Sequence, residues 1–199
     1  MQAFIVVDVQ NDFCPGGSLA VPEGDRVVPV VNARRRDFAL TVFTQDWHPP
    51  HHSSFASSHP GRKPFDVIEL GGRRQVLWPD HCVQETPGAA FHPALEIHPD
   101  DPVFRKGELP AVDSYSAFLD NDRQHETGLR AFLAARGGDA VCVAGRALDV
   151  CVKFTVLDAL RYGLRASVLR AGCRAVNVQP EDERQAYREM EQAGAILLP

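Results

Sequence analysis

Residues 140–151 read Ala-Val-Cys-Val-Ala-Gly-Arg-Ala-Leu-Asp-Val-Cys, and this stretch decides the fold. Its first five residues are continuously apolar, as in a strand that is covered on both faces, which is typical of a parallel sheet. Comparable stretches recur along the chain at 3–8, 39–44, 102–105, 165–170 and 195–198. The first stretch belongs to a predicted strand at 139–145. Together, the six strands predict an α/β fold: a three-layer αβα sandwich with a mostly parallel sheet of about six strands.

Helical patterns fill the gaps between these strands. They predict helices over 24–36, 125–136, 148–162 and 180–193, and the third of these has apolar residues at helical spacing before Gly163 ends it. The segment 46–101 differs, because it is rich in Pro, Gly, Ser and His and has little periodicity. We expect an irregular excursion there, of the kind that carries function.

Bulk properties narrow the class of protein. A chain of 199 residues with 44% hydrophobic and 24% charged residues is typical of one globular domain, here 1–199. The net charge of -5 argues against nucleic acid as a partner. The start of the chain lacks the pattern of a signal peptide, and no apolar run is long enough for a bilayer, so we expect a cytoplasmic protein without membrane contact. The sequence is compatible with a homo-oligomer.

Four polar side chains stand where predicted strands end. Asp8 ends the first strand, Asp46 follows the second, Lys106 follows the third and Cys151 comes shortly after the fourth. Because the carboxyl ends of parallel strands share one edge of a sheet, where ligands bind, we expect these residues to converge. Helix capping or a surface salt bridge is the alternative interpretation of Asp8.

Cys151 and Lys106 suggest chemistry individually as well. Cys151 is expected in the first turn of a helix, where the dipole favours the thiolate and lowers the thiol pKa, although simple packing of a buried cysteine is the alternative. The five cysteines include no Cys-x-x-Cys pair of the kind used in zinc or redox sites, and Cys142 is expected to be a small buried hydrophobic residue. The chain has three lysines against eighteen arginines, so a lysine at 106 indicates a need for a compact cation.

The histidines gather in one region. Four of the eight lie within 46–59, which begins Asp46-Trp47-His48, and His81 follows Trp78-Pro79-Asp80. Imidazole and carboxylate ligands suit a borderline divalent ion, so the pattern favours one bound Zn, Fe or Mn ion over ordinary surface histidines.

Longer motifs resemble a known family. They are Asp-Val-Gln-Asn-Asp-Phe at 8–13, Thr-Gln-Asp-Trp-His at 44–48, Trp-Pro-Asp-His-Cys-Val at 78–83, Phe-Arg-Lys-Gly at 104–107 and Asp-Val-Cys-Val at 149–152. In order and spacing the chain resembles the bacterial nicotinamidases (pyrazinamidases) of the isochorismatase-like cysteine hydrolase superfamily over nearly its whole length.

The resemblance implies an amidohydrolase with a catalytic triad of Asp8, Lys106 and Cys151. Cys151 would attack the amide carbon and form a thioester, while Asp8 would move the protons and Lys106 would position Asp8. Backbone amides of Ala147 and Cys151 would form the oxyanion hole, beside a cis peptide that falls at Arg146-Ala147.

The resemblance also implies how substrate is held. By this resemblance the metal ligands are Asp46, His48, His52 and His81, and the metal would bind the ring nitrogen of the substrate. Phe13 and Trp78 would form the aromatic walls of the substrate pocket, with Leu19 and Tyr115 nearby. The implied reaction is hydrolysis of nicotinamide to nicotinate and ammonia in NAD salvage and pyridine nucleotide biosynthesis, with pyrazinamide as an alternative substrate.

The chain departs from the family near the nucleophile. The usual Gly-apolar-Ala-Thr-Asp-x-Cys appears here with Arg146 in the apolar position, Leu148 in place of the threonine and Val150 in place of Tyr or His. We expect a cation beside the oxyanion turn and an effect on rate or substrate preference.

Three other functions remain open from the sequence. One is a related amidohydrolase acting on a carbamoyl or ureido substrate. A second is a metallohydrolase in which metal-bound water attacks, and a third is a catalytically silent ligand-binding domain.

Overall fold

The computed structural model describes residues 1–199, and its centre is a six-stranded sheet in the order β5-β2-β1-β6-β7-β8, with every neighbouring pair parallel. The strands are β1 (Gln2–Val7), β2 (Thr41–Asp46), β5 (Val103–Lys106), β6 (Ala140–Arg146), β7 (Arg165–Arg174) and β8 (Ile196–Leu198). The predicted fold class is therefore confirmed, because all six apolar stretches form strands of this sheet.

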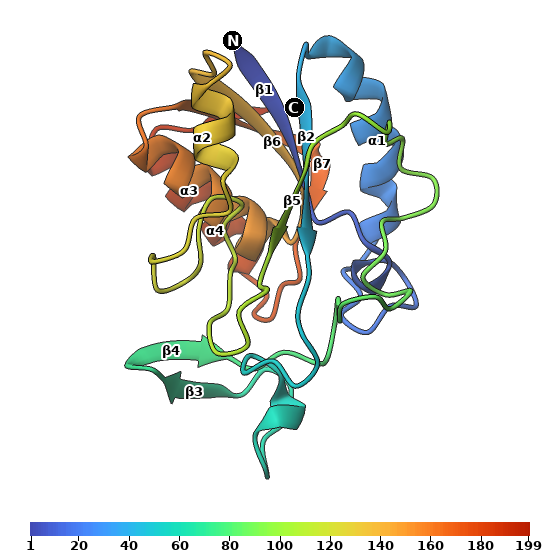
Figure 1. The fold of residues 1–199 in the computed structure, drawn as a ribbon, viewed down its shortest axis with the longest axis vertical. Helices are drawn as coiled ribbons and strands as arrows, with labels where there is room; N and C mark the ends of the chain where they lie inside the picture. The colour runs from blue at the N-terminus through green and yellow to red at the C-terminus, as the bar shows by residue number, and fades with distance from the viewer.

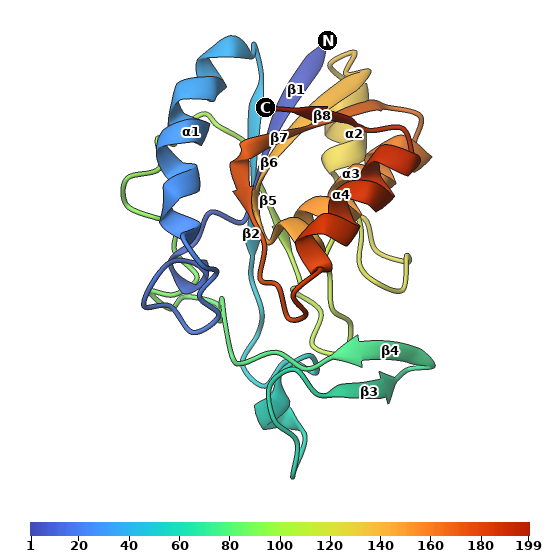
Figure 2. The same ribbon diagram turned by 180° about the vertical axis from the view of Figure 1, so that it is seen from behind.

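Helices cover both faces of the sheet. Helix α1 (Val27–Arg34) lies on one face, and α2 (Leu129–Ala134), α3 (Lys153–Arg161) and α4 (Asp182–Gln192) lie on the other (Figures 1 and 2). This gives the three predicted layers. A core of 34 buried residues runs through them, and all seven residues of β6 are buried, as its continuous apolar sequence indicates. None of these helices has the length and apolar character needed to cross a membrane.

Several element bounds differ from the prediction. Strand β7 runs four residues beyond 170, because a register shift between Val143 and Gly145 lets its last residues pair with the end of β6. The helix expected over 24–36 has short 3-10 turns at both ends of α1, at Gly24–Arg26 and Arg35–Asp37. Helix α2 is also shorter than predicted, since residues up to Gly128, with φ 91°, belong to the preceding loop.

The excursion 46–101 contains one regular element that the sequence interpretation missed. Strands β3 (Val67–Leu70) and β4 (Arg73–Val76) form an antiparallel hairpin, which projects from the end of the molecule where β2 and β5 end (Figure 1). Gly71 and Gly72 turn the chain with φ values of 58° and 77°, which glycine adopts without strain. A short 3-10 turn, Ala56–Ser58, is the only helical element of the excursion.

Candidate active site

The four predicted strand-end residues meet at one edge of the sheet. Asp8 follows β1 directly with φ 49°, and Asp46 and Lys106 are the last residues of β2 and β5, paired in register with each other. Cys151 lies in the π-helical turn Leu148–Val152, which follows β6 and runs into α3. Because β5, β2, β1 and β6 are adjacent in the sheet, residues distant in sequence come together here.

Lys106 is the centre of this group. Its Nζ lies 2.9 Å from Asp8 Oδ2 and 3.0 Å from Asp46 Oδ1, and it donates a hydrogen bond to the Ser114 carbonyl at 3.0 Å. Cys151 Sγ lies 3.5 Å from the same nitrogen. The structure therefore brings Asp8, Lys106 and Cys151 together, and all three side chains are buried.

Burial and neighbouring charges set the protonation of this group. Burial favours a neutral Lys106, but the carboxylates of Asp46 and Asp8 outweigh it and raise the lysine pKa well above its usual value. Burial raises the pKa of Asp8, and the positive charge of Lys106 opposes that shift. Lys106 is thus a permanent cation beside a carboxyl group that is easier to protonate than usual.

The expectation of a lowered thiol pKa at Cys151 is wrong in this structure. Burial raises the pKa of Cys151 well above that of a free thiol, with opposition from Lys106 and support from the carboxylates of Asp8 and Asp46. The physical reason is that burial of the sulfur and the two nearby carboxylates outweigh the positive charge of Lys106. The raised pKa favours the protonated thiol, so attack by the sulfur calls for a neighbour that takes up its proton.

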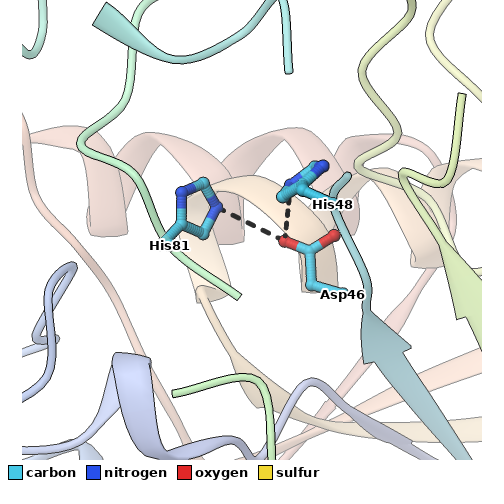
Figure 3. Close-up of side chains that lie close together, drawn as sticks. All are labelled: Asp46, His48 and His81. Atoms are coloured by element: carbon cyan, nitrogen blue, oxygen red, sulfur yellow. Dashed lines mark ion pairs between the residues drawn. The ribbon is translucent and has the colours of Figure 1, made fainter. Parts of the chain in front are cut away.

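Three of the four predicted metal ligands also converge. Asp46 Oδ2 lies 3.3 Å from His48 Nε2 and 3.5 Å from His81 Nε2, and the three side chains face one another (Figure 3). The other ring nitrogen of His48 donates to the Gly107 carbonyl at 3.0 Å, and that of His81 donates to the Pro79 carbonyl at 2.8 Å. In the neutral form of each ring these bonds leave the Nε2 lone pair available to a ligand, so the donor set fits a divalent ion.

His52 departs from the predicted ligand set. Its Nδ1 contacts Ser54 Oγ at 2.8 Å, and its Nε2 donates to the Leu109 carbonyl at 2.9 Å. Both ring nitrogens therefore have protein partners, and the side chain groups with His48 and Asp113 instead of with Asp46 and His81.

A mainly apolar cavity opens onto the sulfur of Cys151 and the cluster of Asp46 and His81. All four residues predicted for the pocket line it, together with residues of the nucleophile turn, the metal-cluster residue His81 and two that sequence reasoning did not single out. The predicted pocket residues are Phe13, Leu19, Trp78 and Tyr115; the turn contributes Ala147 and Val150; the two additional residues are Asp113 and Val176.

The nucleophile turn has the expected backbone. The Arg146–Ala147 peptide bond is cis, and both Ala147 and Cys151 line the cavity. The side chain of Arg146, however, does not line the cavity and turns toward Phe13 and Cys14. The expected cation therefore points toward Phe13 and Cys14, away from the cavity.

Two buried polar residues of the site were not predicted. Thr44 Oγ1 donates to Asp8 Oδ1 at 2.6 Å and accepts from the Asp8 amide at 3.2 Å. Asp149 accepts hydrogen bonds from the amides of Val176 at 2.9 Å and Asn177 at 2.8 Å, which holds one wall of the cavity. Thr44 could have been found from its place beside Asp46 at the end of an apolar strand, whereas the partners of Asp149 lie 27 and 28 residues away.

The architecture and site agree with comparisons to known proteins. The model of the Isochorismatase domain matches residues 2–199. The chain belongs to the isochorismatase family. A curated nicotinamidase of Escherichia coli is 50% identical to this family member over 201 residues, which cover 98% of this chain and 93% of the relative.

Solved structures also resemble this chain over nearly their whole length. A nicotinamidase and pyrazinamidase from Acinetobacter superposes with a TM-score of 0.96 at 45% identity, covering 99% of this chain and 95% of that one. A pyrazinamidase from Pyrococcus horikoshii, solved in complex with zinc, gives a TM-score of 0.82 at 38% identity and covers 99% of this chain and 98% of its own.

Proposed function

We propose that the protein is a nicotinamidase that hydrolyses nicotinamide to nicotinate and ammonia, with pyrazinamide as an alternative substrate. The single observation that carries this proposal is the shared lysine: Lys106 contacts Asp8, Cys151 Sγ and the metal-ligand carboxylate Asp46. The 50% identity to a curated nicotinamidase over nearly the whole chain supports the same reaction.

The reaction begins with proton transfer from Cys151 to Asp8. The raised pKa of Asp8 makes it a better proton acceptor than an ordinary carboxylate, and Lys106 stabilises the negative charge that passes between the two groups. The sulfur then bonds to the amide carbon, and Asp8 returns the proton to the leaving nitrogen as the carbon–nitrogen bond breaks, releasing ammonia.

The second half of the reaction hydrolyses the thioester. Asp8 takes a proton from a water molecule, whose oxygen attacks the thioester carbon, and the proton passes to the departing sulfur. Backbone amides of Ala147 and Cys151 hold the developing oxyanion in both halves. Loss of one such donor typically costs about 3 to 4 kcal/mol of transition-state stabilisation.

Recognition of the ring uses the cavity walls and the metal cluster. Phe13 and Trp78 line the cavity and provide apolar faces for a flat ring. Asp46, His48 and His81 would hold one divalent ion, Zn, Fe or Mn, and a bound ion supplies a Lewis acid for the pyridine nitrogen. His52 supports this cluster through its contact with the His48 ring, 4.4 Å between centroids.

The proposal extends to the setting of the reaction. We assign it to salvage of nicotinamide for NAD in the cytoplasm, by a single domain spanning 1–199 that can form a homo-oligomer. The substrate is a small molecule; nucleic acid and membrane are not partners, in keeping with the net charge of -5.

The deciding experiment measures ammonia release by the purified, metal-loaded protein. We expect turnover of nicotinamide and pyrazinamide, and much weaker turnover of benzamide, which is a flat amide without a ring nitrogen. An N-carbamoyl amino acid tests the carbamoyl alternative. Equal rates on nicotinamide and benzamide would contradict the role of the metal cluster, and turnover of the carbamoyl compound alone would replace the proposed substrate.

Cys151→Ala tests the nucleophile. We expect turnover to fall at least about a thousandfold, because sulfur forms the covalent intermediate, while the metal content stays the same because none of the ligands is changed. Metal content and ammonia release are measured on the same samples. Substantial turnover by the metal-loaded variant would favour attack by metal-bound water instead.

A further inference from the structure

Arg146 is completely buried, yet its guanidinium group is only partly hydrogen-bonded. Nη1 donates to the Phe13 carbonyl at 3.2 Å and to Cys14 Sγ at 2.9 Å. Nε and Nη2 have no partner. Gly24 makes room for this side chain, since a Cβ there would lie 2.9 Å from Nη1. A guanidinium stays charged in proteins, and unpaired buried donors are costly, so this group favours any additional acceptor that comes within reach.

Cys14 lies between this cation and the surface. Cys14 is 6% exposed and lines an open surface depression together with Pro15, Gly16, Pro87 and Gly88. Its thiol donates a weak hydrogen bond to the Gln10 carbonyl at 3.3 Å. Cys142 and Cys173 differ, because they lie within β6 and β7 and belong to the main hydrophobic core. Cys14 is thus a thiol that a small solute can approach on one side and a buried cation contacts on the other.

We propose that Cys14 is an oxidation site for small hydroperoxides, whose sulfenic acid product is bound by Arg146. The Cys14 sulfur attacks one peroxide oxygen: the sulfur–oxygen bond forms, the oxygen–oxygen bond breaks, and the second oxygen takes up the thiol proton and leaves as water from hydrogen peroxide or as an alcohol from an organic hydroperoxide. Sulfur loses two electrons and the peroxide gains them. The new oxygen sits one bond from Sγ, beside Nη1 of Arg146, which already contacts that sulfur at 2.9 Å, and it accepts a hydrogen bond from this guanidinium. A thiol reductant reverses the change through a mixed disulfide.

Oxidation at Cys14 also affects the cavity. The nitrogen that contacts Cys14 Sγ is the same Nη1 that holds the Phe13 carbonyl, and the Phe13 side chain forms a wall of the cavity. An oxygen on the sulfur competes for that donor and loosens Phe13. The expected effect is a higher KM for nicotinamide with kcat little changed. This second step rests on the proposed function, whereas the oxidation itself does not.

The first test is a labelling experiment on metal-loaded Cys151→Ser protein, which lacks the proposed nucleophile. The protein is treated with hydrogen peroxide and the sulfenic acid reagent dimedone, and each cysteine peptide is quantified by mass spectrometry. We expect about tenfold more adduct at Cys14 than at Cys142 or Cys173, which serve as internal controls. Equal labelling of the three cysteines overturns the proposal, and this comparison requires no change near Arg146.

Variants then test the role of the cation. Arg146→Met removes the donors while keeping an unbranched buried side chain, and we expect the adduct at Cys14 to fall about tenfold. Arg35→Met, at a partly buried arginine paired with Asp101, is the matched control and should leave labelling unchanged. Unchanged labelling in folded Arg146→Met protein overturns the assignment of Arg146.

The effect on the cavity is measured separately. Cys14→Asp places a permanent oxygen acceptor beside Arg146, and Cys14→Ser adds none with a comparable charge. With Cys151 intact, we expect KM for nicotinamide to rise several-fold in Cys14→Asp and to change little in Cys14→Ser. Equal KM values overturn the link to Phe13. Absence of nicotinamide turnover in every protein contradicts the proposed function, while the labelling result still decides the oxidation site.

Discussion

At the scale of single residues, Thr44 controls the proton acceptor. Its hydroxyl donates to Asp8 Oδ1 at 2.6 Å, and this bond favours the ionised carboxylate, opposing the effect of burial on the Asp8 pKa. Thr44→Val removes the bond and raises the pKa of Asp8 further. Because Asp8 must be ionised to accept the thiol proton, we expect the acid limb of the kcat/KM profile to move to higher pH, with about a tenfold loss at acid pH.

A matched control separates this effect from loss of packing. Thr41→Val makes the same change at a buried position of the same strand, opposite Phe4 and remote from Asp8. We expect its pH profile to coincide with that of the unchanged protein. A Thr44→Val profile with an unshifted acid limb would contradict the role of Asp8 as the base, whatever the loss in rate.

The residues also mark the limit of prediction from sequence. Asp8, Asp46, Lys106 and Cys151 could be grouped because each follows an apolar strand, and parallel strands end at one edge. The direction of the Arg146 side chain could not be predicted, because it depends on the packing of Phe13, Cys14 and Gly24 more than a hundred positions away. The raised thiol pKa depends on burial of the sulfur beside two carboxylates, an arrangement that also appears only in three dimensions.

At the scale of elements, the turn after β5 holds the metal cluster in place. Gly107 has φ 70°, and its carbonyl accepts the hydrogen bond that orients His48. A Cβ at this position would lie 2.5 Å from His48 Cε1 and 3.1 Å from Asp46 Oδ1. Glycine is therefore required both by the backbone conformation and by the close approach of two metal ligands.

Gly107→Ala should displace His48 and weaken metal binding. We expect metal retained after dialysis against a chelator to fall about tenfold or more, and the free energy of unfolding to fall by about 1 to 2 kcal/mol. Gly61→Ala is the control, because Gly61 has φ 78° but open space around its Cβ position. Gly61→Ala should lower the free energy of unfolding without changing metal retention. Equal metal retention in the two variants would argue against Gly107 as the support of the cluster.

Elements were predicted from sequence to different degrees. The strands were found because continuous apolar residues reflect burial on both faces. The β3–β4 hairpin was missed although Gly71 and Gly72 separate its strands, because β3 and β4 are half-exposed and carry no strong apolar alternation. Residues 125–128 fit a helical pattern, but contacts between His125 and Asp120 hold them in a loop.

At the scale of the whole molecule, backbone hydrogen bonds join the excursion to the strand ends. The Trp47 amide donates to the Lys106 carbonyl at 2.9 Å, at the end of β5, and the His92 amide donates to the Val9 carbonyl at 2.9 Å, just beyond β1. Both tryptophans, Trp47 and Trp78, belong to this excursion. Their fluorescence therefore reports on the excursion, while far-ultraviolet circular dichroism reports mainly on the sheet and helices.

We expect the metal-loaded chain to unfold in urea as one unit. The fluorescence and circular dichroism transitions should share a midpoint, because the excursion and the sheet edge depend on the same buried residues. Trp47→Phe protein, in which Trp78 alone reports, should give the same midpoint. A fluorescence transition at lower urea would identify the excursion as a separately unfolding part and contradict the single domain.

The lysine shared between sulfur and metal-ligand carboxylate has an evolutionary consequence. One ammonium group pairs with Asp8 on one side and with Asp46 on the other. In a related protein that had lost the metal ion and Asp46, Lys106 would pair with Asp8 alone. The electrostatic environment of the Cys151 nucleophile would then differ. Divergence toward amides without a ring nitrogen is therefore expected to change the residues around that ammonium together with the metal ligands.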